Sequence, residues 1–134
     1  MATVVVLPDN TWAARDVVLD GLPDAVDVGG TSATEVCGEL VRTNPSPPLV
    51  VVAYGSSCAL LPAVALAQRT AHRRVSAYVL VDPVPPASSD AWPDAPVTVV
   101  TDDPQIVRLS TLRGWSVSTV DVVTVIQQIT GEAD

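Results

Sequence analysis

The fold of this chain is decided by the stretch LVVVAYGSSCA at residues 49–59. Its first part, Leu49–Tyr54, is an apolar run typical of a strand that is buried on both faces of a parallel sheet. Very small residues follow, and the mostly apolar segment 56–72 then predicts a buried helix. A buried strand, a sharp turn and a buried helix form one βα unit, and such units build parallel sheets covered by helices.

The same alternation extends over the whole chain. Further strands are predicted at 3–7, 25–28, 75–81, 97–101 and 115–120, and helices at 12–22, 32–43, 103–113 and from Asp121 to Gly131. The segment 82–96 contains five prolines and predicts a loop. This order predicts an α/β fold, a three-layer αβα sandwich around a mostly parallel sheet of about six strands. We expect one domain, 1–134.

Local signals support several of these helix ends. Ser32 and Glu35 have the spacing of a capping box, and Val36, Leu40 and Val41 follow at helical spacing to form an apolar face. Asp103 followed by proline predicts an N-cap, and Gly114 predicts the end of that helix.

Composition excludes several classes of function. The chain has 134 residues, a formal net charge of −8 and no lysine, so it lacks the basic stripe that a nucleic-acid partner requires. Arg69, Arg73 and Arg74 gather at one helix end, where cations match the negative end of the helix dipole. One histidine and two cysteines are too few for a metal site or a disulfide framework. We expect no metal and no cofactor.

The N-terminal segment 1–9 has no basic region and too short an apolar run for a signal peptide. No segment approaches the roughly 18 apolar residues of a membrane span. These features predict a cytoplasmic protein with no membrane partner.

In four stretches the chain resembles the α/β-hydrolase family. The stretch 3–22, with LPDNTWAA, is similar to the family's third strand, oxyanion-hole loop and following helix, and 49–67 is similar to its nucleophile elbow. The stretches 75–86 (VSAYVLVDPVPP) and 97–104 resemble the next strand with its turn and the strand that ends near the catalytic acid. The resemblance implies a truncated member without the first two strands and without a lid.

The elbow can be aligned in two registers. Matching Leu60-Leu61-Pro62-Ala63 to the family pattern places Gly55 at the apex, where the nucleophile would stand and where a positive φ suits glycine. The alternative places Ser57 at the apex, with Ser56 as a further candidate nucleophile.

The remaining catalytic groups implied by the resemblance are incomplete. A serine hydroxyl needs a histidine to accept its proton, and the loop 117–121, where the family supplies it, contains none. His72 lies at the far end of the elbow helix. Asp103 matches the family's acid, and Asp82 is the alternative acid.

The carboxyl ends of the strands are the expected ligand site, since open α/β sheets bind ligands there. Asp9 and Asn10 stand in the family's oxyanion-hole loop, and backbone amides near Asn10 and Ser56 can still face a carbonyl. The candidate ligand-binding residues are Asp9, Asn10, Trp12, Tyr54, Gly55 and Asp102, with Trp92 as a further aromatic group.

Four functions remain open. The first is a degenerate α/β-hydrolase-like protein that binds a small acyl, lactone or polyketide-type ligand, with acid-base or cyclisation chemistry as an option. The second is an esterase or thioesterase that uses Ser57 or Ser56. The third is a non-catalytic subunit that forms a homodimer or binds a companion enzyme through the edge strand 25–28. The fourth is a flavodoxin-like domain, although PDNT at 8–11 is not a phosphate-binding glycine loop.

Overall fold

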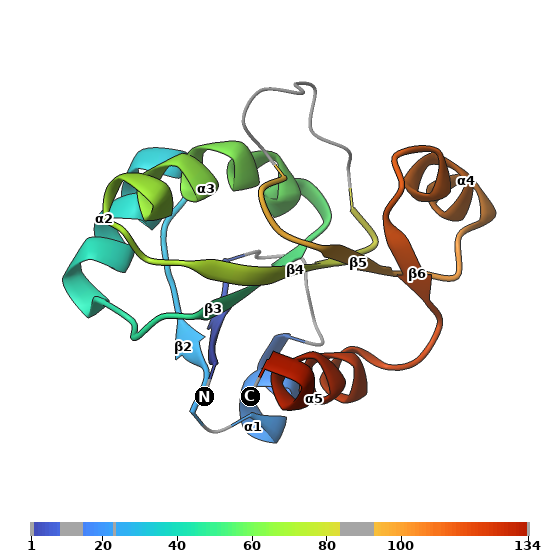
Figure 1. Ribbon diagram of the computed structural model, residues 1–134, viewed down its shortest axis with the longest axis horizontal. Coiled ribbons are helices and arrows are strands. Elements are labelled where there is room, and N and C mark those ends of the chain that lie inside the picture. The colour runs from blue at the N-terminus through green and yellow to red at the C-terminus, as the bar shows by residue number, and fades with distance from the viewer. Residues whose placement is uncertain (1, 9–14, 23, 84–92, 134) are drawn as a thin grey trace.

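The strand β3 (Leu49–Tyr54) lies in the interior of a single six-stranded sheet, with its first five residues buried (Figure 1). The computed structural model describes residues 2–8, 15–22, 24–83 and 93–133. The other elements of this part, in chain order, are β1 (Thr3–Val6), α1 (Arg15–Gly21), β2 (Val26–Asp27), α2 (Ala33–Thr43), the 3₁₀ helix η1 (Gly55–Leu60), α3 (Leu61–Thr70), β4 (Val75–Val81), β5 (Val97–Val100), α4 (Pro104–Leu112), β6 (Ser116–Ser118) and α5 (Val122–Ala133).

The predicted fold class is confirmed. Every strand pairs in parallel with its neighbours, in the order β2-β1-β3-β4-β5-β6. The first five strands therefore follow the 2-1-3-4-5 order of flavodoxin-like doubly wound sheets. β2 lies on one side of β1, and β3 and the later strands lie on its other side. The order of the strands across the sheet therefore reverses after β2, and the helices are divided between the two faces of the sheet.

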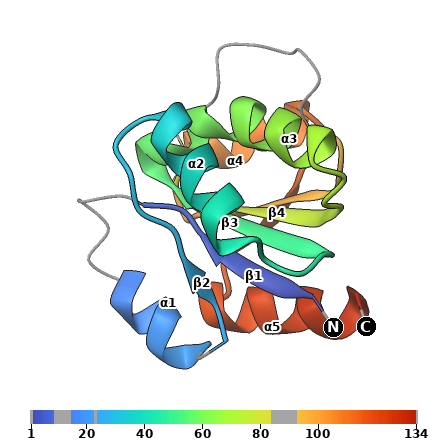
Figure 2. The same ribbon diagram turned by 90° about the vertical axis from the view of Figure 1, so that its left-hand side faces the viewer.

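Figures 1 and 2 show α2, α3 and α4 over one face and α1 and α5 over the other. Each face has its own buried cluster. Leu80 of β4, Leu40 of α2 and Val64 of α3 belong to the first cluster, while Val79 of β4 and Ile126 of α5 belong to the second. Successive residues of β4 thus serve opposite layers, as the period of two in a strand requires.

Several helix signals act as predicted. Ser32 caps α2, and its Oγ accepts a hydrogen bond from the Glu35 amide at 3.2 Å. The other half of the expected capping box differs, because the Glu35 carboxylate accepts from the amide and the hydroxyl of Thr31. Asp103 caps α4, and Gly114 follows that helix with a φ of +79°. Val36 and Leu40 are buried as expected.

Other predictions were wrong about where helices and strands begin or end, or about which residues are buried. Val41 does not belong to the apolar face of α2, because the residue is 68% exposed. The helix expected over 56–72 begins with 3₁₀ turns and ends at Thr70, and its Leu66 is 58% exposed. Gly131 does not end the last helix, which continues to Ala133. The strands expected at 25–28 and 115–120 are shorter, namely β2 and β6.

The edge strand expected at 25–28 does lie at the edge of the sheet, but β2 contains only two residues. Very short edge strands are one way in which proteins avoid edge-to-edge pairing. This geometry does not favour β2 as a docking strand. No helix in the described segments has the length and apolar character needed to cross a membrane.

Candidate functional site

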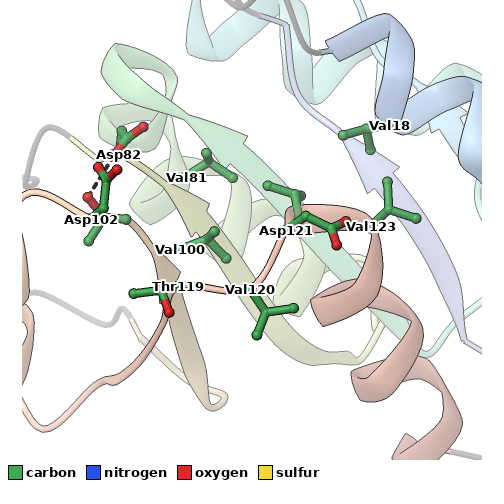
Figure 3. Close-up of a pocket in the computed structure, with 11 residues that line it drawn as sticks. Val18, Val81, Asp82, Val100, Asp102, Thr119, Val120, Asp121 and Val123 are labelled. Atoms are coloured by element: carbon green, nitrogen blue, oxygen red, sulfur yellow. Dashed lines mark hydrogen bonds between the residues drawn. The ribbon is translucent and has the colours of Figure 1, made fainter.

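A pocket of about 340 Å³ opens where β4, β5 and β6 end, on the face that α1 and α5 cover (Figure 3). Residues 119–121 join β6 to α5 and contribute to the lining, and α1 is only seven residues long. The pocket is lined by Val18, Val81, Asp82, Val100, Thr101, Asp102, Thr119, Val120, Asp121, Val122 and Val123.

The pocket is apolar over most of its wall, with valines from both the sheet and the helices. Val81 and Val100 are the last residues of β4 and β5, and Val18 and Val123 come from α1 and α5. Val120 remains 44% exposed, although valine gains free energy when it is buried. A ligand with an apolar body would cover this surface.

Asp82 is held at the rim by a short chain of hydrogen bonds. It lies directly after β4 with a φ of +43°, a region that is uncommon for residues other than glycine. The hydroxyl of the buried Thr101 donates to its Oδ1 at 2.6 Å, and the same hydroxyl oxygen accepts from the Asp103 amide at 3.1 Å. The Thr101 proton is thereby directed at Asp82, whose Oδ1 acts as the acceptor.

Asp102 lies on the same side of the pocket as Asp82 in Figure 3. Its side chain is exposed and forms no hydrogen bond or ion pair with any described residue. No described residue therefore competes with a ligand for hydrogen bonds to the two oxygens of Asp102.

Asp121 stands across the valines from this pair in the view of Figure 3 and is already engaged. It caps α5, with Oδ1 accepting from the Thr124 amide at 3.1 Å and Oδ2 from the Thr124 hydroxyl at 2.6 Å. The hydrogen bond from the Thr124 side chain, followed by that from its amide, lowers the pKa of Asp121. Asp121 therefore adds a fixed negative charge to the pocket at neutral pH.

The polar side chains of this pocket mainly offer hydrogen-bond acceptors. Three carboxylates line it, and no arginine or histidine does so among the described residues. Such a pocket suits a ligand that donates hydrogen bonds and disfavours one with a carboxylate or phosphate. In the described segments no three histidine, cysteine or acidic residues are grouped so that they could hold a metal ion.

The turn after β3 begins with a glycine that has the expected positive φ. Gly55 has a φ of +55°. Ser57 is only 6% exposed, and its Oγ accepts from the Tyr54 amide at 3.0 Å and donates to the Tyr54 carbonyl at 2.8 Å. Ser56 is exposed, whereas His72 lies beyond the opposite end of α3. The hydroxyl of Ser57 thus stabilises the turn.

The structure brings together only part of the predicted site. Asp82 and Asp102 line the pocket, but Asp103, Ser56, Ser57, Tyr54 and Gly55 do not. Asp103 directs its Oδ1 to the Gln105 amide at 2.9 Å as a helix cap. Tyr54 packs against the α1–α5 side of the core. The predicted residues Asp9, Asn10, Trp12 and Trp92 lie outside the described residues.

Sequence reasoning missed Thr101, Thr119 and Asp121 as site residues, as well as all the valines of the lining. The sequence contained one signal for Thr101, because this hydroxyl residue follows the last residue of β5 and directly precedes the pair Asp102-Asp103. The contributions of Val18 and Val123 had no such signal, because they depend on how α1 and α5 sit against the sheet.

A comparison of the chain with protein families, with curated proteins and with solved structures finds no match.

Proposed function

We propose that this chain is a degenerate α/β-hydrolase-like protein that binds a small, mostly apolar ligand of the acyl, lactone or polyketide type. The ligand's body would lie against the valines between α1 and α5. Its hydroxyl groups would donate hydrogen bonds to Asp102 and to Oδ2 of Asp82, which accepts no hydrogen bond from a described residue. The observation that carries this proposal is the exposed carboxylate of Asp102, which has no partner among the described residues and lies at the wall of an apolar pocket.

The same geometry supports a non-hydrolytic reaction more than an ester cleavage. A carboxylate within hydrogen-bond distance of a ligand hydroxyl can act as a general base. In a cyclisation step Asp102 would take the proton of that hydroxyl as its oxygen adds to an electron-poor C=C bond of the same ligand, and it would return the proton to the carbon that carries the electron pair of the broken π bond. Thr101 keeps Asp82 in place beside it. An acyl ligand would fit through its hydroxyl groups, because a free carboxylate would face Asp82, Asp102 and Asp121.

Fluorescence titration with 2-naphthol tests the proposal. We expect saturable binding of 2-naphthol and at least tenfold weaker binding of the anion 2-naphthoate. Asp102→Asn should weaken 2-naphthol binding about tenfold, because a hydrogen bond to a charged acceptor contributes roughly 1.5–3 kcal/mol. Asp24→Asn is the matched control, since Asp24 is exposed and lies outside the pocket. Equal affinity for naphthoate, or an unchanged affinity in Asp102→Asn, would contradict the proposal.

A fluorophosphonate probe separates this proposal from the esterase alternative. We expect no covalent labelling, because the Ser57 hydroxyl is bound to the Tyr54 main chain and the chain's single histidine lies beyond the far end of α3. Ser57→Ala and Ser56→Ala provide the paired controls. Labelling of the parent chain that disappears in either variant would establish a serine nucleophile instead.

A further inference from the structure

A second pocket, which the proposed function does not use, lies at the amino ends of the strands, whereas the first pocket lies at their carboxyl ends. It has a volume of about 460 Å³ and opens at the amino ends of β3, β4, β5 and β6. It is lined by Pro48, Arg74, Ser76, Ala77, Pro96, Thr98, Ser116 and Ile129.

The charge of this pocket is opposite to that of the first. Arg74 is the charged residue in its lining, and no acidic residue lines it within the described part of the chain. This is unusual in a protein with 15 acidic and 7 basic residues. Arg74 is exposed and forms no ion pair with a described residue, whereas Arg42 pairs with Glu39 and Arg69 with Asp94.

Two hydroxyl groups lie beside each other in the floor of this pocket. Thr98 of β5 and Ser116 of β6 are register partners, so their positions are about 4.8 Å apart across the sheet. Thr98 faces the same side as Val100, which packs in the α1–α5 cluster. Neither hydroxyl has a hydrogen-bond partner among the described residues, and both can donate to a ligand. Ser76 differs, because its Oγ donates to the Leu49 carbonyl at 3.2 Å.

We infer that this pocket binds the oxyanion of a ligand, a phosphate or a carboxylate, between the Arg74 guanidinium and the hydroxyls of Thr98 and Ser116. A guanidinium gives strong charge-assisted hydrogen bonds to either group. The carboxyl end of α5 approaches through Ile129, and the negative end of its dipole opposes an anion. We therefore expect weak binding of a simple ion, with a Kd on the order of 1 mM.

Titration of the ¹⁵N-labelled full chain with inorganic phosphate at low ionic strength tests this inference. We expect saturable shifts at the amides of Arg74, Thr98 and Ser116. Arg74→Gln should weaken binding at least tenfold, and Thr98→Val, which keeps the shape of the side chain, should weaken it about threefold. Arg108→Gln is the control, because it makes the same charge change on α4, which covers the opposite face. It should leave the affinity unchanged.

A parallel titration with sodium acetate distinguishes the two sources of the oxyanion, since the anion that binds more tightly identifies the ligand group. The absence of saturation with both anions would overturn the inference. Equal weakening by Arg74→Gln and Arg108→Gln would also overturn it, because general charge attraction would then explain the shifts. The result is independent of 2-naphthol binding, which is measured at the other edge of the sheet.

Discussion

Leu80→Ala will lower the free energy of unfolding by about 3 kcal/mol, within the range of 2–5 kcal/mol for a buried leucine cut to alanine. Leu80 is fully buried in β4, between β3 and β5, and faces the helices α2 and α3. Its loss would leave a cavity that the sheet cannot close, because both neighbouring strands are hydrogen-bonded to β4. Urea denaturation measures the change, and the melting temperature should fall by about 10 °C.

Leu112→Ala is the matched control for this experiment. Leu112 ends α4 and is 75% exposed, so its truncation removes little buried surface. We expect a change within about 0.5 kcal/mol. Equal losses in the two variants would mean that Leu80 does not face the core, and the assignment of β4 side chains to the two faces would then be wrong.

Arg15→Met will lower the free energy of unfolding by about 2–3 kcal/mol, because it removes a charged group that donates hydrogen bonds to backbone carbonyls at the carboxyl ends of β1 and β2. The Arg15 guanidinium pairs with Asp27 and donates to the carbonyls of Leu7 at 3.1 Å and Val28 at 3.3 Å. Its side chain is only 16% exposed. Methionine preserves much of the side-chain length, so the lost stability would report the hydrogen bonds more than the packing.

The control for Arg15 is Arg42→Met on α2. The Arg42 side chain is 72% exposed and pairs with Glu39 one helical turn away. Exposed pairs of this kind contribute at most about 1 kcal/mol, and we expect a change below about 0.5 kcal/mol. A loss of similar size in both variants, measured by urea denaturation, would show that the hydrogen bonds of Arg15 to the strand ends do not stabilise the fold.

These carbonyl contacts also bear on what the first strand-to-helix connection can bind. Doubly wound domains often hold a phosphate near this point, at a helix N-terminus. The positive charge of Arg15 is instead neutralised by Asp27 and directed at backbone carbonyls. The described cation closest in sequence to β1 therefore binds groups of the protein itself. Arg74, which has no ion-pair partner among the described residues, lies at the amino ends of the strands.

Much of the candidate site follows from the position of residues relative to strand ends. Asp82 and Asp102 could be predicted because each follows a strand whose apolar run is plain, and parallel strands bring their carboxyl ends to one edge. Asp103 was a candidate because it matches the place of the catalytic acid in the family that the chain resembles, but it caps α4 and does not line the pocket. One step along the chain separates a residue that lines the pocket from one that does not, and sequence spacing alone does not resolve this.

The sequence by itself determined the alternation of strands and helices, the parallel sheet, the capped starts of α2 and α4, and the glycine in the turn after β3. These features depend on interactions between residues that are close along the chain. Tertiary structure alone decided that α1 and α5 share one face, that they leave a valine-lined pocket in which Asp102 has no partner among the described residues, and that Arg74, Thr98 and Ser116 line one second pocket. Such contacts join residues that are distant in sequence, and they exist only when the sheet is assembled.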